Sequence, residues 1–228
     1  ALKGHRIHLV GRRKNVLEAN SKDLIGRGAS EVDTTVADLG KPLEVDSIWK
    51  NLIKTETQID RVLIAYGVLG DQQETTSNLS ALETNLNTNF VSAALWAETA
   101  FAYFKTQGSG QITVIGSVAG DRGRQSNYHY GAAKGGLDVF VSGLAHKAAK
   151  TRESRIGVLL VKPGFIDTPM TDGLDKGGPL WATPEKVAKI IRRAETKGKT
   201  KIYAPWFWRF ILLIVRFLPF SVFKRSSL

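Results

Sequence analysis

Apolar positions along this chain follow two alternating patterns. Short runs rich in Val, Ile and Leu are typical of buried strands in a parallel sheet. We expect such strands at residues 7–10, 32–38, 61–65, 111–115, 155–161 and 201–203. Between them, apolar side chains recur at helical spacing, which predicts helices at 14–25, 43–57, 79–106, 130–144 and from 183 onward. Strands that alternate with helices indicate an α/β protein with helices on both faces of a parallel sheet.

The richest candidate chemistry follows the strand at 111–115. Ser117 lies just beyond the carboxyl end of this strand, where ligands bind in open α/β sheets. Tyr130 and Lys134 are four residues apart at the start of a helical pattern, so they share a helix face. An ammonium near a phenol favours the phenolate, and a serine hydroxyl can polarise a carbonyl oxygen. The three side chains suit hydride chemistry at a carbonyl or alcohol, although the Tyr–Lys spacing alone also occurs by chance on solvated helices.

The order and spacing of these segments resemble the short-chain dehydrogenase/reductase family. Tyr130 follows Ser117 by thirteen residues, Lys134 comes next, and Val-Lys-Pro-Gly-Phe-Ile-Asp-Thr follows at 161–168. The likeness runs from about residue 6 to residue 196. It implies a Rossmann-like doubly wound fold and an enzyme that moves a hydride between a nicotinamide cofactor and a CH-OH or C=O group. It further implies that Tyr130 is the acid/base, Ser117 positions the substrate oxygen, and Lys134 lowers the tyrosine pKa and holds the cofactor ribose.

An asparagine completes the catalytic set that the resemblance implies. Asn89 matches the helix asparagine that supports the lysine through a water molecule, and Asn87 is the competing candidate. Asparagine is mildly unfavourable inside a helix, which suits a functional role. A satisfied surface amide is the ordinary alternative.

The adenosine end of the cofactor is expected near residues 11–13 and 38–39. Arg12 and Arg13 follow the strand at 7–10, and arginine suits a 2′-phosphate through its charge and fork geometry. This favours NADP (NADPH) over NAD, with a solvated basic turn as the alternative. By the resemblance, Asp38 and Leu39 lie beside the adenine, although Asp38 could instead cap a turn.

Two further segments belong to the implied cofactor site. Ala65 and Gly67 stand where the family often has Asn-Asn-Ala-Gly, so the small residues are kept and the strand-tying asparagine is lost. After the strand at 155–161, the implied cofactor residues are Pro163, Gly164, Ile166 and Thr168, of which the last two match positions at the nicotinamide carboxamide. Tyr130 and Lys134 contribute to the same site.

The sequence contains neither the family's first strand nor its glycine-rich phosphate loop. Gly26-Arg-Gly28 and the glycines of 116–120 lie in other places, a helix-to-strand turn and the catalytic loop. Without the first strand, its two neighbours in the sheet are left unpaired. We therefore expect the natural protein to carry a further N-terminal piece.

Composition bounds the remaining possibilities. The 228 residues suit one α/β catalytic domain, expected at 1–204, and the absence of cysteine excludes a thiolate metal site and a cysteine nucleophile. A net charge of +11 predicts a polyanionic neighbour, such as nucleic acid, anionic lipid or a phosphorylated small molecule. No nucleic-acid reading motif is visible and the basic residues are dispersed, so we expect no nucleic-acid partner. A catalytically impaired binding or scaffold protein is the other alternative.

The C-terminal segment 205–228 differs from the rest of the chain. Aromatic and aliphatic residues from Trp206 onward are interrupted by Arg209, Arg216 and Pro219, which is unfavourable for a membrane span. The pattern predicts an amphipathic helix at a membrane interface, with a cover over the substrate pocket or a dimer surface as the alternatives. Residues 169–182 lack a period and predict a mobile substrate lid. The tail resembles the branch acting on hydrophobic or lipid-linked substrates, including decaprenylphosphoryl keto-sugar reductases, which implies a cytoplasmic homo-oligomer that is peripheral on the membrane.

Overall fold

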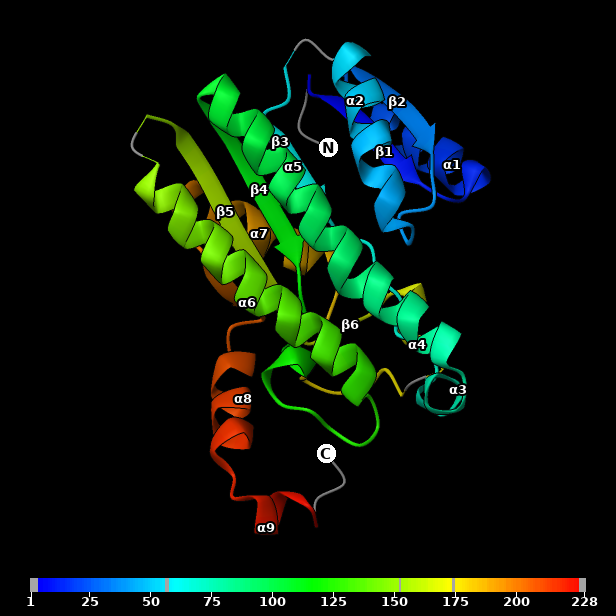
Figure 1. Ribbon diagram of the computed structural model, residues 1–228, viewed down its shortest axis with the longest axis vertical. Helices are drawn as coiled ribbons and strands as arrows, with labels where there is room; N and C mark the ends of the chain where they lie inside the picture. The colour runs from blue at the N-terminus through cyan, green and yellow to red at the C-terminus, as the bar shows by residue number, and fades with distance from the viewer. Residues whose placement is uncertain (1–3, 56–57, 152, 174, 226–228) are drawn as a thin grey trace.

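Parallel strands build the centre of the protein (Figure 1). The structure, a computed structural model, describes residues 4–55, 58–151, 153–173 and 175–225. One sheet pairs β1 (Arg6–Gly11) with β2 (Glu31–Val36). A second sheet runs in the order β3 (Arg61–Ile64), β4 (Ser109–Ile115), β5 (Arg155–Pro163) and β8 (Lys201–Ala204). All of these pairings are parallel, and β8 lies at one edge of the second sheet.

Helices cover both faces of the four-stranded sheet, which confirms the doubly wound α/β architecture. The long helices are α1 (Lys14–Gly26), α2 (Val45–Thr55), α5 (Ser92–Gln107), α6 (Tyr128–Lys150) and α7 (Pro184–Thr196). Figure 1 shows α5 and α6 on one face and α7 on the other. Side chains of β5 alternate accordingly, because Val158 and Leu160 join the core under α5 and α6 while Leu159 and Val161 join the core under α7.

The expected interruption of the sheet lies between β1 and β3. Among the strands that the structure describes, β1 pairs with β2 alone and β3 pairs with β4 alone. Leu63 on β3 is 60% exposed, although its neighbour Ile64 is buried. In these two sheets, β1 and β3 are therefore the two neighbours that were predicted to lack a pairing partner between them.

Several local elements differ from the sequence prediction. The helix expected at 79–106 is three pieces, because α4 (Leu79–Leu86) leads into a π-helical turn (Asn87–Val91) before α5 begins. A short polar helix, α3 (Gln72–Ser77), precedes it and starts at the side-chain cap of Asp71. The strand expected at 32–38 ends at Val36. Within the described residues, the helix expected at 43–57 covers Val45–Thr55, and residues 56–57 of that prediction lie outside them.

The lid expected at 169–182 contains more order than its sequence indicates. A 3-10 turn (Pro169–Thr171) and the strand β7 (Trp181–Ala182) fall within it. β7 pairs in parallel with β6 (Phe165–Ile166), which follows β5. Both ends of the segment are therefore held to the body of the protein.

The tail forms two helices rather than the single helix predicted. α8 (Trp208–Phe217) ends before Pro219, and α9 (Phe220–Phe223) follows. Leu218 is extended because a residue that precedes proline is disfavoured in helical geometry. Within the described ranges, no helix has both the length and the apolar character that crossing a membrane requires. Residues 226–228 of the expected tail domain and 1–3 of the expected catalytic domain lie outside the described residues.

Candidate active site

The structure brings Ser117, Tyr130 and Lys134 together at the carboxyl end of β4. Ser117 follows β4 and caps a 3-10 turn (Val118–Asp121), where its Oγ accepts a hydrogen bond of 3.1 Å from the backbone N–H of Ala119. α6 begins at Tyr128, so Tyr130 and Lys134 occupy its first two turns as predicted. The Lys134 Nζ lies 5.8 Å from the centre of the Tyr130 ring, and the Ser117 hydroxyl is near enough to the Tyr130 phenol to affect its pKa.

Close backbone packing holds residues 117–121, which we call the Ser117 turn, against α6. A Cβ atom on Gly120 would lie only 2.7 Å from the backbone at Lys134 and Gly135. A Cβ atom on Gly131 would lie 2.9 Å from the carbonyl oxygen of Ala119. Glycine is therefore required on both sides of this contact, and the contact brings the turn beside the helix that carries Tyr130 and Lys134.

Burial dominates the electrostatics of the site. Lys134 is 3% exposed, its Nζ donates a hydrogen bond of 3.2 Å to the carbonyl oxygen of Ile115, and desolvation lowers its pKa to about 8. Desolvation also raises the pKa of Tyr130 above its usual value, and the nearby Ser117 hydroxyl opposes this only in part. The role expected for Lys134, lowering the tyrosine pKa, stays a prediction, and burial of the phenol is the largest influence on the Tyr130 pKa.

Asn89 occupies the π-helical turn and is fully buried. Its side chain binds both backbone groups of Val68, accepting from the N–H at 3.1 Å and donating to the carbonyl at 2.8 Å. A Cβ atom on Gly67 would meet the Asn89 Oδ1 at 2.8 Å and the Lys134 Nζ at 3.4 Å, so the two side chains flank the same glycine. Asn87 is only partly buried, and the geometry therefore favours Asn89 over Asn87.

The sequence reading missed two side chains that support this segment. Asn85 is buried, donates to the carbonyl oxygen of Leu69 at 3.1 Å, and accepts from Asn89 at 3.1 Å. Its four-residue spacing from Asn89 was the available signal. Tyr66 stands where the family often has asparagine, and its hydroxyl lies 2.7 Å from the Ser92 Oγ. This bond links the end of β3 to α5.

A pocket of about 290 Å³ collects half of the predicted cofactor residues. Its lining includes Arg12, Arg13, Asp38, Leu39, Ala65 and Gly67. Val68, Thr88 and Met170 also line it, and sequence reasoning did not single them out. The Asp38 carboxylate accepts a hydrogen bond of 2.9 Å from the Gly40 N–H, so the turn-capping alternative holds while Asp38 also faces the pocket.

The other predicted cofactor residues lie outside that pocket lining. Pro163 is buried at the end of β5, and Gly164 lies under the indole of Trp208, where a Cβ atom would clash at 1.9 Å. Ile166 belongs to β6, and Thr168 begins the turn at Pro169–Thr171. These four residues follow the carboxyl end of β5, on the same edge of the sheet as Ser117.

The match to known proteins agrees with this arrangement. Residues 1–178 match the family model described as short chain dehydrogenase. The chain belongs to the short-chain dehydrogenase/reductase family. As a member of that family, it is an NAD(P)-dependent oxidoreductase acting on CH-OH or C=O groups.

The similarity to relatives of the enzyme covers nearly the whole chain. An uncharacterized oxidoreductase of Mycobacterium tuberculosis is 32% identical over 97% of this chain and 88% of its own length. An uncharacterized oxidoreductase of Streptomyces coelicolor is 31% identical over 96% of this chain and 84% of its own. A short-chain dehydrogenase from Sphingobium yanoikuyae, solved in complex with NADPH, superposes with a TM-score of 0.79 at 20% identity, covering 98% of this chain and 87% of that one.

The residues present fit a nicotinamide dinucleotide. The pocket joins two arginines, whose charge suits a phosphate, to Ala65 and Gly67, which leave the backbone open to a ligand. Gly67 also borders Asn89 and Lys134, and a side chain at this position would fill the space between the pocket and these two residues. The pocket residues are therefore compatible with the family's nicotinamide cofactor.

Proposed function

We propose that this oxidoreductase uses NADPH to reduce a carbonyl group on a hydrophobic or lipid-linked substrate, with Tyr130 as the proton donor. The observation that carries the proposal is the convergence of Ser117, Tyr130 and Lys134 next to a pocket lined by Arg12 and Arg13. The bound cofactor supplies the hydride. The protein supplies the proton and the orientation of the substrate.

A protonated phenol is the form of Tyr130 that the reductive direction needs. The raised pKa of Tyr130 keeps the phenol protonated at neutral pH, as proton donation to a carbonyl oxygen requires. The Ser117 hydroxyl, which lies near the phenol, can donate to the same oxygen as negative charge develops there. Lys134, with a pKa of about 8, retains most of its positive charge at neutral pH.

Replacing Tyr130 by phenylalanine tests the proton donor. Tyr130→Phe should lower kcat about 100-fold or more, because only the ionisable hydroxyl is lost. NADPH oxidation is followed against a panel of aromatic ketones, 3-oxo steroids and a decaprenylphosphoryl keto-sugar. Tyr128→Phe, on the same helix and 43% exposed, is the matched control and should keep wild-type turnover. Turnover by Tyr130→Phe within a few-fold of wild type would remove Tyr130 from the acid/base role.

The preference for NADPH over NADH rests on Arg12 and Arg13. Both are exposed at the pocket and follow β1, where a charged fork can reach a phosphate from solvent. The fold neighbour from Sphingobium yanoikuyae was solved with NADPH, which supports the same choice.

Removing the charges of Arg12 and Arg13 should affect the binding of NADPH and NADH differently. Arg12→Gln with Arg13→Gln should weaken NADPH binding by about 2 to 4 kcal/mol and leave NADH binding nearly unchanged, because charge-assisted hydrogen bonds contribute about 1.5 to 3 kcal/mol each. Lys14→Gln removes a neighbouring charge that does not line the pocket and serves as the control. Titrations of cofactor fluorescence measure both affinities. Equal losses for NADPH and NADH would instead assign the arginines to loop stability.

The tail supports a hydrophobic substrate at a membrane surface. Its exposed apolar side chains are Trp206, Phe210, Leu213, Ile214, Phe217, Phe220 and Val222. Exposed Arg209, Arg216, Lys224 and Arg225 lie among them and suit anionic headgroups. The opposite side of the tail is seated near the lid, because the Phe165 ring lies 5.4 Å from Trp208 and 5.2 Å from Trp181. Such a tail can bring the mouth of the site to a lipid surface.

Flotation with liposomes tests this attachment. Binding should increase with the fraction of phosphatidylglycerol and fall several-fold in Arg209→Gln with Arg216→Gln, because about 1 kcal/mol per basic residue is at stake near an anionic surface. Lys186→Gln with Lys189→Gln removes the same charge from exposed positions on α7 and should bind like wild type. Protein that stays entirely in the bottom fraction, or a tail that sedimentation and crosslinking place between two copies, would contradict membrane attachment.

A further inference from the structure

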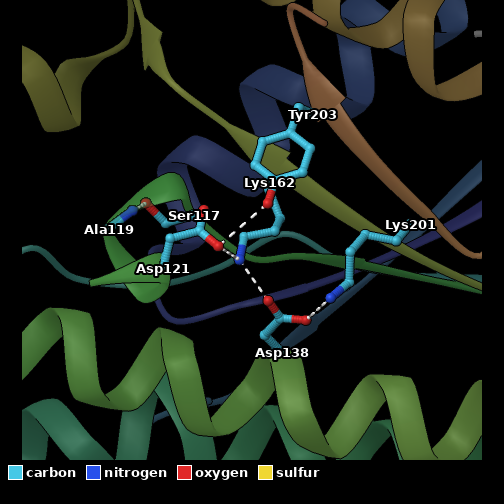
Figure 2. Close-up of polar contacts among 7 residues, drawn as sticks. All are labelled: Ser117, Ala119, Asp121, Asp138, Lys162, Lys201 and Tyr203. Carbon is cyan, nitrogen blue, oxygen red and sulfur yellow. Dashed lines mark hydrogen bonds and ion pairs between the residues drawn. The ribbon is translucent and has the colours of Figure 1, made fainter. Parts of the chain in front are cut away.

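A second buried ammonium group lies close to the active site. Lys162, the next-to-last residue of β5, is 1% exposed. Burying an ammonium group at this depth is costly unless opposite charges compensate for its desolvation. Its Nζ lies 2.9 Å from the Asp121 Oδ1 and 2.5 Å from the Asp138 Oδ2 (Figure 2). Lys162 therefore bridges two carboxylates from different parts of the chain.

The two carboxylates belong to the two halves of the active site. Asp121 is the last residue of the Ser117 turn. Asp138 lies on α6, one helical turn beyond Lys134. Figure 2 shows the Lys162 ammonium between the turn on one side and the helix on the other. Through Lys162, strand β5 connects the Ser117 turn to α6. This connection involves neither the Ser117 nor the Tyr130 side chain.

Two further side chains contact the carboxylates of Asp121 and Asp138, one each. The Tyr203 hydroxyl donates to the Asp121 Oδ1 at 3.2 Å, and Lys201 forms an ion pair with Asp138. Both come from β8, and Lys201 is the more exposed of the two lysines, with 40% of its side chain accessible. Among the described residues, the Asp121 Oδ2 is buried without a hydrogen-bond partner, so Asp121 depends on the contacts at its other oxygen. Lys201 contacts the helix side of the cluster, whereas Lys162 contacts both sides.

We propose that Lys162 is a positioning residue of the active site: its ammonium group ties the Ser117 turn to α6 and thereby holds Ser117 beside Tyr130. The inference rests on the proposed roles of Ser117 and Tyr130. The glycine contact at Gly120 sets how closely the turn approaches the helix, and the charged bridge keeps it from sliding along the helix.

Hydrogen exchange tests the bridge without a substrate. In Lys162→Met, the amides of 117–121 should exchange about tenfold faster than in wild type, while exchange in β4 and the middle of α6 changes little. Lys201→Met is the matched control, because it removes an ammonium from Asp138 without touching the turn, and its 117–121 peptide should exchange like wild type. An unchanged exchange rate of this peptide in Lys162→Met would overturn the proposal, whatever the catalytic results.

A double-mutant cycle tests whether Lys162 acts through Ser117. In the NADPH-dependent reduction of the panel substrate that wild type turns over, Lys162→Met should lower kcat about tenfold or more and change the KM for NADPH less than about twofold. In a Ser117→Ala background the same substitution should cost less than about twofold, since the positioned hydroxyl is already gone. Lys162→Arg should restore most of the loss. Fully additive losses, or no rescue by arginine, would overturn the positioning role.

A variant that does not fold and a wild-type enzyme that reduces no panel substrate each require a further step. Lys162→Met leaves two carboxylates near each other without their shared cation, so the variant could fail to fold. In that case Lys162→Met with Asp121→Asn and Asp138→Asn removes the buried charges together, and the same exchange and cycle results are expected of it. If wild type reduces nothing in the panel, the proposed function fails, and the exchange experiment alone decides the role of Lys162.

Discussion

Two lysine ammonium groups buried at one edge of the sheet constrain the active site. Lys162 lies between two carboxylates, whereas Lys134 donates a hydrogen bond to the carbonyl oxygen of Ile115. Burial is stabilised by charge pairing in the first case and opposed by desolvation in the second, which lowers the pKa of Lys134 to about 8. Lys162, held in ion pairs, can thus hold the scaffold, whereas Lys134, which has no carboxylate partner among the described residues, stays available to a ligand. The rest of the site is arranged around this difference.

The parallel sheet explains why these groups meet. Ser117 follows β4, Lys162 is the next-to-last residue of β5, and Tyr203 lies on β8, so all three lie at the carboxyl edge of neighbouring strands. α6 crosses this edge with Tyr130 and Lys134 in its first turns. The tail is attached at the same edge, because Arg122, next to Asp121, donates hydrogen bonds to the carbonyl oxygens of Val215 and Leu218 at 2.5 Å and 2.7 Å. A surface that binds the tail is therefore one residue away from the Ser117 turn.

The sequence predicted those parts of the protein that depend on local periodicity or fixed spacing. Apolar runs identified the strands, and the four-residue spacing of Tyr130 and Lys134 placed them on one helix face. The π-helical turn at Asn87–Val91 was not predicted, because one inserted residue leaves the apolar pattern of a helix almost intact. The Lys162 bridge was also missed, because its partners are 41 and 24 residues away and no local pattern connects them. The raised pKa of Tyr130 depends on burial, which spacing does not report.

The most direct test of this electrostatic arrangement is the titration of Lys134 itself. Lysine labelled with carbon-13 at Cε gives a signal for each side chain, and its loss in Lys134→Met identifies the signal of Lys134. Burial without a carboxylate predicts a midpoint near pH 8 for this signal, as its pKa is lowered to about 8. A midpoint at the ordinary value of 10.5 would contradict the account, because Lys134 would then be as well solvated as a surface lysine.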